Sequence, residues 1–431
     1  ATRVDDTHSA MSAAAVQQST ELALLTAALA INYIAHRRRQ QPQSELVAAE
    51  LAKAEAQVVS LRTQLQRPPR PTLSIGREEI RIFMDGAFDL FHYGHANAFR
   101  QGLALGTYLV VGVNDDVSIT ECKGAPLCND EERLAMVRGC KFVDEVVERV
   151  PYVMTDEYLN YVIQKYRIDF VVHGDDPCIV NGKDVYASAQ ALGKYRTIPR
   201  TEGISTTEVV GRMLTTAPPP AKKGAAAAAP LAFVRDSHFM TTTQMLYQFA
   251  GQKQKPPAGA RVVYVEGGWD MFHAAHVHFL EAAAKLGDYL LVGVHADSVL
   301  HNKRGANYPI LNLNERVLSV LACGHVDDVV IGPPRQITKE MLAALKVSVV
   351  AHGSVHSGCN ERRGLSDSYE VPKQMGIFTE VPSRGQLTVE TIVQRINDNH
   401  ERFASKVARK MKSEQEYYDA RYGFDGEAPK N

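Results

Sequence analysis

Two histidines three residues apart, His92 and His95, are the residues of this chain best suited to chemistry by type and spacing. They end the segment DGAFDLFHYGH at 85–95, which follows an apolar stretch and opens a segment of helical composition. Residues three apart share one face of a helix, and a helix N-terminus attracts phosphate. Two imidazoles there can donate hydrogen bonds to a phosphoryl group on which negative charge develops. The pair predicts phosphate chemistry. A zinc pair is the alternative, although the glutamate of the HExxH pattern is missing.

A second segment with phosphate-binding potential is RTEGISTTE at 200–208, followed by the apolar helical stretch Val209–Leu214. Ser205 and Glu208 have the spacing of a capping box, in which side chains satisfy the first amides of a helix. The same amides could hold a phosphate, with Arg200 as a cationic clamp. The alternative is an ordinary helix cap without a ligand.

Lys123, followed by Gly124, is expected on a loop after the apolar stretch YLVVGV at 108–113. A lysine there would add a compact positive charge for a phosphate. A single lysine is also what a solvated surface carries, so both interpretations stay open at this point.

These residues need a scaffold, and the chain supplies alternating strands and helices from residue 79 onward. Such alternation implies parallel pairing and an α/β sandwich, in which ligands bind beyond the carboxyl ends of the strands. The expected strands are Ile80–Met84, Tyr108–Val113, Asp144–Val147 and Phe170–His173, and the expected helices are Ala96–Leu105 and Glu131–Arg138.

The pattern of the first part of the chain returns in the second. FHYGH at 91–95 is matched by FHAAH at 272–276, and YLVVGV at 108–113 is matched by YLLVGV at 289–294 with the same separation. A repeat of this length is a duplicated domain and not a solenoid unit of about 20–50 residues. Further matches are Arg81–Met84 with Arg261–Val265, Glu131-Glu132-Arg133 with Asn314-Glu315-Arg316, and His173-Gly174 with His352-Gly353.

The repeat divides the chain into two domains with additional segments. Residues 217–230 are rich in Ala, Pro and Lys, which is typical of a linker, whereas His238–Gly251 has enough apolar residues to pack against a domain. The expected order is a helical N-terminal extension at 1–70, a first domain at 71–216, a linker at 217–259, a second domain at 260–400 and a helical tail at 401–431.

Composition limits what these domains can do. The chain has 431 residues, 45% hydrophobic and 23% charged, with a net charge of −1 at pH 7. These values fit globular domains and exclude a disordered, collagen-like or coiled-coil chain. Near-neutrality argues against binding to polymeric nucleic acid, which requires a large positive excess. Six cysteines without a short-spaced framework predict reduced thiols in the cytoplasm and no metal site built from Cys or His.

The N-terminal extension carries a feature that suggests a membrane. Leu22–Ala35 is mostly apolar and is followed by the basic cluster Arg37–Arg39, as at the cytoplasmic flank of an anchor. The run is shorter than the about 17–25 apolar residues of a spanning helix. Membrane contact through residues 16–39 and an amphipathic or coiled-coil helix therefore both stay open. Heptad spacing at 44–66 supports a short helix pair, and the basic residues lie on the wrong side for a secretory signal.

DGAFDLFHYGH at 85–95, Lys123-Gly124 and RTEGISTTEVVGRML at 200–214 together resemble the cytidylyltransferase family of the HxGH nucleotidyltransferases. Two such domains with HGDDPC at 173–178 and YEVPKQMGIF at 369–378 resemble the members that act on phosphoethanolamine. The resemblance implies two tandem Rossmann-like parallel-sheet domains. It also implies transfer of cytidylyl from CTP to phosphoethanolamine, which yields CDP-ethanolamine for phosphatidylethanolamine synthesis and releases pyrophosphate, with Mg²⁺ accompanying CTP.

The resemblance, which covers about residues 79–400, also implies roles for individual residues. His92 and His95 would contact the CTP phosphates and stabilise the pentavalent state of an in-line attack. Lys123 would bridge the α-phosphate and the incoming phosphate, and Arg200 would hold the β/γ end, so that positioning and charge neutralisation supply the catalysis. The other residues implied for CTP binding are Gly86, Ala87, Phe88, Asp89, Gly94, Gly174, Asp175, Gly203, Ile204, Ser205, Thr206 and Thr207.

The alcohol part of the substrate needs its own recognition. The ammonium of ethanolamine has three N–H donors for a carboxylate, whereas the quaternary ammonium of choline needs aromatic faces. Asp175 and Asp176 follow a strand end and are candidates, with a turn before Pro177 as the alternative. Phosphocholine, glycerol 3-phosphate or another nucleotide such as ATP are alternative substrates. A non-catalytic nucleotide-binding scaffold at membranes is an alternative class, and a homo-oligomer is compatible with either.

The second repeat departs from the motif. Ala275 stands where the first repeat has Gly94, and Trp269 replaces Phe88. We expect a domain that turns over poorly or not at all, while nucleotide binding and a purely structural role stay open. Residues that such binding would use are Gly268, Trp269, His273, His276, Arg304, His352, Gly353, Leu387 and Thr388.

Overall fold

The computed structural model describes residues 79–175, 179–180, 183–201, 203–216, 242–251, 256, 258–304, 308–354, 367–383, 387–409 and 412. The expected N-terminal extension at 1–70 lies outside the described residues, as do most of the expected linker and the end of the expected tail. Residues from 79 onward form one compact unit. In the part of the chain that is described, no helix is both long and apolar enough to cross a membrane.

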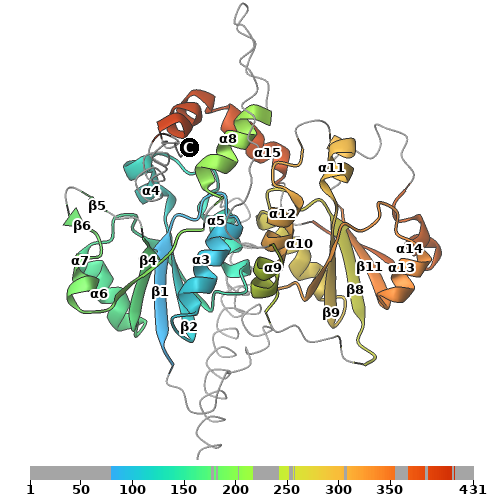
Figure 1. The fold of residues 1–431 in the computed structure, drawn as a ribbon, viewed down its shortest axis with the longest axis horizontal. Helices are drawn as coiled ribbons and strands as arrows, with labels where there is room; N and C mark the ends of the chain where they lie inside the picture. Colours follow the sequence, from blue (N-terminus) through green and yellow to red (C-terminus); the bar gives the residue numbers. More distant parts are fainter. Residues whose placement is uncertain are drawn as a thin grey trace, which may run out of the picture. The chain divides into compact units, whose positions relative to one another are not determined.

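The first repeat folds around a five-stranded parallel sheet in the order β3-β2-β1-β4-β7 (Figure 1). Its central strand β1 pairs with β2 from Arg81 opposite Tyr108 to Gly86 opposite Val113. Because successive side chains of a strand point to opposite faces, this strand contributes to a core on each side of the sheet. The strands are β1 (Arg81–Gly86), β2 (Tyr108–Asn114), β3 (Glu145–Val150), β4 (Phe170–Gly174) and β7 (Tyr195–Ile198).

Helices cover both faces of this sheet, which confirms the predicted α/β class (Figure 1). Ile82 of β1 is buried in a core with Phe99 of α3, whereas its neighbour Phe83 is buried in a second core with Leu159 of α6. The helices are α3 (Tyr93–Leu103), α4 (Asp116–Lys123), α5 (Asp130–Gly139), α6 (Asp156–Lys165), α7 (Ala187–Ala191) and α8 (Thr206–Thr216), and a short antiparallel pair consists of β5 (Ile179–Val180) and β6 (Lys183–Asp184).

Two sequence predictions change in detail. The helix expected from Ala96 begins at Tyr93, because His92 caps its N-terminus. Lys123, expected on a loop, is the last residue of α4. This helix starts where the Asp115 carboxylate accepts the Ser118 N–H at 2.8 Å, so a local cap creates a helix that apolar periodicity did not reveal.

The second repeat has the strand order β10-β9-β8-β11-β12, which matches the first sheet and confirms the duplicated domain. Both sheets are parallel in every named pairing (Figure 1). The strands are β8 (Val262–Gly267), β9 (Tyr289–Val294), β10 (Asp328–Ile331), β11 (Val347–Gly353) and β12 (Phe378–Val381). The helices are α10 (Ala274–Ala284), α11 (Asp297–Arg304), α12 (Leu313–Leu321), α13 (Lys339–Ala344), α14 (Glu370–Gln374) and α15 (Val389–Asn397), and residues 400–409 are also helical.

The two repeats share one hydrophobic core. Helix α5 packs against α10, and α3 packs against α12. The contact is close, because a Cβ on Gly139 of α5 would lie 2.6 Å from Val277 Cγ1 of α10. Helix α9 (Thr242–Ala250), within the expected linker, adds Met245 and Phe249 to this core.

Backbone pairing also joins the repeats. The N–H of Lys141 donates to the carbonyl of Ala322, and the N–H of Gly324 donates to that of Gly139, both at 2.8 Å. These bonds form an isolated antiparallel bridge with Cys140 opposite Cys323. Among the described cysteines no disulfide forms.

Two arginine–glutamate pairs lie at equivalent positions of this interface. Arg212 of α8 contacts Glu315 of α12 with N–O distances of 2.7 and 3.0 Å. Arg395 of α15 contacts Glu132 of α5 at 2.7 and 2.8 Å. Arg395 follows Arg212 by as many residues as Glu315 follows Glu132. The repeats are therefore related by approximate two-fold symmetry, as in a symmetric dimer built from one chain.

Candidate functional site

The path of the chain through the first sheet opens a crevice at its carboxyl edge. From β1 the chain moves to β2 and β3 on one side, and later to β4 and β7 on the other. The connections therefore diverge between β1 and β4, and open α/β sheets bind ligands at such a switch point. The histidine segment follows β1 at Gly86, and Asp175 follows β4 at Gly174.

His92 and His95 lie at the start of α3, where the backbone fixes both rings. Nδ1 of His92 accepts a hydrogen bond from the Gly94 N–H at 3.1 Å, and Nδ1 of His95 accepts one from the His92 N–H at 3.3 Å. The ring centroids are 4.0 Å apart. A neutral imidazole that accepts at Nδ1 carries its proton at Nε2. The helix therefore selects the tautomer in which Nε2–H is the donor, which suits phosphoryl oxygens.

Gly94, between the two histidines, is required by close packing. A Cβ at this position would lie 2.7 Å from Ile204 Cγ2 and 2.8 Å from the ring of His92. Real Cβ atoms do not come this close to a neighbour, so a side chain would push the His92 ring or the 200–208 segment away.

The 200–208 segment lies directly against the histidine segment. Asn97 Nδ2 donates to Thr201 Oγ1 at 2.9 Å, and Thr206 Oγ1 contacts the carbonyl of Asp89 at 3.4 Å. Ser205 caps α8, because its Oγ accepts the Glu208 N–H at 3.1 Å. The structure thus brings together the two motifs that the sequence predicts to share a site. Nearby, Arg200 is half-buried, Gly203 has a φ of +79°, and Thr207 is buried.

The loop between β1 and α3 is held by Asp89. Its two carboxylate oxygens accept the N–H groups of Leu127 and Cys128, each at 2.9 Å. Phe88 in this loop has a φ of +49° and is almost fully buried, with its ring against Gly86, where a Cβ would lie 3.1 Å away. Ala87 is buried beside it. Asp89 therefore connects the histidine loop to the loop after α4.

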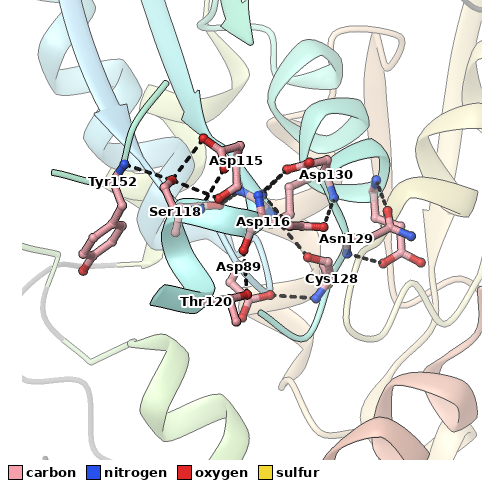
Figure 2. A network of polar contacts seen from close by, with 12 residues as sticks. Asp89, Asp115, Asp116, Ser118, Thr120, Cys128, Asn129, Asp130 and Tyr152 are labelled. Carbon is pink, nitrogen blue, oxygen red and sulfur yellow. Dashed lines mark hydrogen bonds and ion pairs between the residues drawn. The ribbon is translucent and has the colours of Figure 1, made fainter. Parts of the chain in front are cut away.

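A polar network joins the starts of α4, the helix that ends at Lys123, and α5 (Figure 2). Asp116 and Asp130 each accept the other's backbone N–H at 3.0 Å. The fully buried guanidinium of Arg133 contacts both carboxylates, at 2.8 and 2.6 Å, and also donates to the Ala87 carbonyl. The network joins the two helix starts to the histidine loop. At the other end of α4, Lys123 Nζ lies 4.7 Å from the ring centre of Tyr152.

Asp85, at the carboxyl end of β1, is a candidate site residue that the motif pattern did not reveal. Tyr186 Oη donates to its Oδ1 at 2.9 Å, and His173, whose ring centroid is 4.9 Å from that of Tyr186, lies at the end of β4. Burial raises the pKa of Asp85, while Tyr186 and His173 act in the opposite direction. Asp85 directly precedes Gly86, the glycine that ends β1, and this position could have identified it as a candidate site residue. Of the two predicted carboxylates, Asp175 is half-buried after β4, and Asp176 lies outside the described residues.

The second repeat keeps the histidine pair, and the exposed fractions of His273 and His92 are similar, 7% and 6%. His273 and His276 have ring centroids 3.8 Å apart, and Nδ1 of His276 accepts the His273 N–H at 3.2 Å. Burial and the charge of Arg304 lower the pKa of His273 to about 3. Burial, His273 and Arg304 lower the pKa of His276 well below its ordinary value. Arg304 ends α11 as Lys123 ends α4, and it lies 3.8 Å from Glu390.

A tryptophan lies beside the histidine pair of the second repeat, with its ring centroid 5.3 Å from that of His276. Trp269 is buried, and its Nε1 donates to the Gly293 carbonyl at 2.8 Å. Thr388 caps α15, where its Oγ1 accepts the Thr391 N–H at 3.2 Å. Two of the other predicted residues are closely packed glycines: a Cβ on Gly268 would lie 2.9 Å from Leu300, and a Cβ on Gly353 would lie 3.0 Å from Ser383. The ring centroids of His352 and Tyr369 are 4.6 Å apart. Leu387 packs against the hydrophobic core.

Comparison with known proteins agrees with this arrangement. A family model described as cytidylyltransferase-like matches residues 83–212 and 264–372, one segment in each repeat. The chain is 41% identical to an ethanolamine-phosphate cytidylyltransferase of Arabidopsis thaliana over 81% of this chain and 88% of the relative. It is 43% identical to one of Dictyostelium discoideum, over 78% and 96% respectively.

A relative named for a different substrate matches a smaller part of the chain. The chain is 42% identical to choline-phosphate cytidylyltransferase A of Rattus norvegicus, but over only 31% of this chain and 36% of the relative. The duplicated architecture is thus shared with the relatives named for ethanolamine phosphate. On the evidence of both repeats, the chain belongs to the ethanolamine-phosphate cytidylyltransferase family.

Proposed function

We propose that this chain transfers the cytidylyl group of CTP to phosphoethanolamine and thereby forms CDP-ethanolamine and pyrophosphate. The observation that carries the proposal is the first-repeat site, where two imidazoles with Nε2–H donors lie beside the capped start of α8. Membership of the family, and relatives named for this activity across both repeats, supports the choice of substrates.

The chemistry is an in-line displacement at the α-phosphorus of CTP. A phosphate oxygen of phosphoethanolamine forms the new P–O bond, the bond from the α-phosphorus to the bridging oxygen breaks, and pyrophosphate leaves with the electron pair. His92 and His95 donate to oxygens on which negative charge increases in the transition state, so they stabilise that state more than the bound substrate. No covalent bond to the protein is needed.

The other charged groups are assigned to different phosphates of the two substrates. We assign the ammonium of Lys123 to the transferring phosphate and the incoming phosphate. The N-terminal amides of α8, with Arg200, would bind the β/γ end, because a helix N-terminus provides unsatisfied N–H groups and a positive dipole.

Mg²⁺ is proposed to accompany CTP. The groups assigned to the phosphates are imidazole, ammonium, guanidinium and backbone N–H donors, which suit phosphate oxygens, whereas Mg²⁺ prefers carboxylate and phosphate oxygens. The ion would therefore be held mainly by the phosphates of CTP, where it neutralises their charge.

For the ammonium of phosphoethanolamine, we propose Asp85 in addition to the predicted Asp175 and Asp176. Asp85 lies at the end of the central strand and is held by the Tyr186 hydroxyl. An ammonium beside this half-buried carboxylate would favour its charged form and find an acceptor for its N–H donors. The quaternary ammonium of choline cannot donate to it.

The direct test is pyrophosphate release from CTP and Mg²⁺ with phosphoethanolamine, phosphocholine or glycerol 3-phosphate as acceptor. We expect turnover with phosphoethanolamine and at least about tenfold lower kcat/KM with phosphocholine, because a lost charged hydrogen bond costs about 1.5–3 kcal/mol. No turnover with any acceptor refutes the transferase. Preference for another acceptor, or for ATP over CTP, supports one of the alternative substrates.

The N-terminal segment, which lies outside the described residues, is proposed to contact the cytoplasmic face of a membrane through residues 16–39. The support is the apolar run followed by Arg37–Arg39. Fractionation of the full chain beside a form that starts at residue 71 tests this. An unchanged soluble fraction would remove the proposal, and size exclusion of the same samples would show whether a homo-oligomer forms.

A further inference from the structure

The loop that follows Lys123 is contacted by the C-terminal part of the second repeat. Arg402 Nη2 donates to the carbonyl of Ala125 at 2.7 Å. Its guanidinium also lies against Gly124, where a Cβ would be 2.5 Å from Nη2. Gly124, which directly follows the last residue of α4, has a φ of +85°, a conformation that favours glycine. An arginine of the other repeat therefore packs on the residue next to Lys123.

Arg395 contacts the far end of the same loop. Its Nη1 donates to the Leu127 carbonyl at 2.8 Å, in addition to the ion pair with Glu132. From the first repeat, Asp89 accepts the Leu127 and Cys128 N–H groups. Residues 124–128 are thus held between the histidine loop on one side and the second repeat on the other.

The segment that carries both arginines is anchored in the shared core. Phe403 and Val407 of the helical stretch 400–409 are 5% and 9% exposed and belong to that core. The Phe403 N–H donates to the Asn399 carbonyl at 3.1 Å, and Asn399 Nδ2 donates to the Arg395 carbonyl at 3.1 Å. The two guanidinium groups therefore project from a support that is fixed relative to the first repeat.

By sequence, Arg402 has no arginine counterpart in the first repeat. Arg212 is the counterpart of Arg395 and donates to the carbonyl of Ile310, the counterpart of Leu127. The sequence separation that relates Arg395 to Arg212 also relates Arg402 to Pro219. Proline has no group able to donate a hydrogen bond to a carbonyl. In the described residues, this second arginine contacts the loop beside Lys123, in the repeat with the intact histidine motif.

We infer that Arg402, assisted by Arg395, is a positioning residue through which the second repeat places Lys123 for catalysis. The inference rests on the proposed cytidylyl transfer. The lysine stem is flexible, so the position of its backbone decides where the ammonium can reach. Misplacement by about 1 Å of a group that binds the transferring phosphate can cost about a hundredfold in rate.

The test compares Arg402→Ala, Arg402→Lys and the control Arg409→Ala in the full chain. Arg409 is exposed on the same helix, and its Nε donates to the carbonyl of Ser405 within that helix. We expect Arg402→Ala to lower kcat by about tenfold to a hundredfold with an unchanged melting temperature and a smaller change in KM for CTP. Arg402→Lys should recover part of the rate, and Arg409→Ala should match the wild type. Equal rates for Arg402→Ala and Arg409→Ala, or a loss explained by lower stability, would overturn the inference.

A double-mutant cycle and hydrogen exchange separate this inference from the proposed function. If Arg402 acts through Lys123, Arg402→Ala adds little loss in a Lys123→Ala background, whereas multiplied losses contradict the inference. Amide exchange of residues 124–128 should be faster in Arg402→Ala. If the wild type has no turnover, the proposed function fails and the exchange still tests the positioning. Unchanged exchange, or faster exchange with an unchanged rate, refutes it.

Discussion

At the scale of single residues, the same histidine pair has different neighbours in the two repeats. The ring separations are nearly equal, 4.0 and 3.8 Å, and His95 and His276 each accept the N–H of the first histidine of their pair. In the second repeat, burial and the charge of Arg304 lower the pKa of His273 to about 3, and the Trp269 ring lies 5.3 Å from that of His276. The motif supplies the imidazoles, and the neighbouring charges and rings differ between the repeats.

Replacement of His92 by Ala should lower turnover by at least about a hundredfold, because the loss of one preorganised donor to a developing charge costs about 2.7–4 kcal/mol. His273→Ala should leave kcat within about threefold, since a cost below about 0.7 kcal/mol corresponds to that range. Steady-state pyrophosphate release measures both variants. Comparable losses would contradict the assignment of turnover to the first repeat alone.

Gly94→Ala should lower kcat by about tenfold or more, because its methyl group would meet Ile204 at 2.7 Å and the His92 ring at 2.8 Å. The matched control is Ala275→Gly at the equivalent position of the second repeat, which should leave the rate unchanged. Pyrophosphate release checks both. A fully active Gly94→Ala enzyme would show that the close packing at Gly94 has no role in placing His92.

At the scale of elements, three helix starts organise the first-repeat site. α3 begins with the histidines, α8 begins with the Ser205 cap, and α4 is fixed by carboxylates of its own first turn and of α5. The sequence predicted α3 and α8 from apolar periodicity and capping residues. It did not predict α4, because only Ile119 of that helix is buried and no apolar stripe marks it.

The two symmetric ion pairs between repeats should differ in their effect on stability. Arg212 lies between the buried Glu208 and Glu315, whose side chains are 3% and 8% exposed. Arg212→Met leaves both carboxylates buried and should lower the free energy of unfolding by about 3–5 kcal/mol. Arg395 and Glu132 are 38% and 15% exposed, so Arg395→Met should cost about 1 kcal/mol. Urea unfolding measures the difference, and equal shifts would contradict it.

At the scale of the whole molecule, the second repeat packs against the first and contacts the loop beside Lys123. Both repeats contribute to one core, and α9 from the expected linker region packs within it. The C-terminal segment of the second repeat reaches back to the loop beside Lys123. A domain without turnover of its own would thus remain necessary for the activity of its partner.

The molecule should lose stability on acidification below about pH 6.5, the ordinary pKa of histidine. His273 has a native pKa of about 3, so between the two values the unfolded chain binds more protons than the native one. The free energy of unfolding therefore falls as pH decreases, by up to about 1.4 kcal/mol per pH unit for this group. His276, with its lowered pKa, acts in the same direction.

Urea unfolding of the wild type and of His273→Gln at pH 7, 6 and 5 checks this dependence. The variant can be less stable at every pH, but its stability should fall less steeply than that of the wild type. Parallel curves would show that His273 is not held neutral by its burial.

Motif residues predicted phosphate chemistry, and their resemblance to a known family implied the transfer reaction. Apolar periodicity predicted the fold class, and the spacing of matched segments predicted the duplication. Other features depend on contacts that form only in the folded chain. Asp85, the α4 position of Lys123 and the contact of Arg402 with the loop of the other repeat all involve groups brought together by folding. Arg402 and Ala125 are 277 residues apart, and no local pattern encodes such a contact, since it depends on how two complete domains pack.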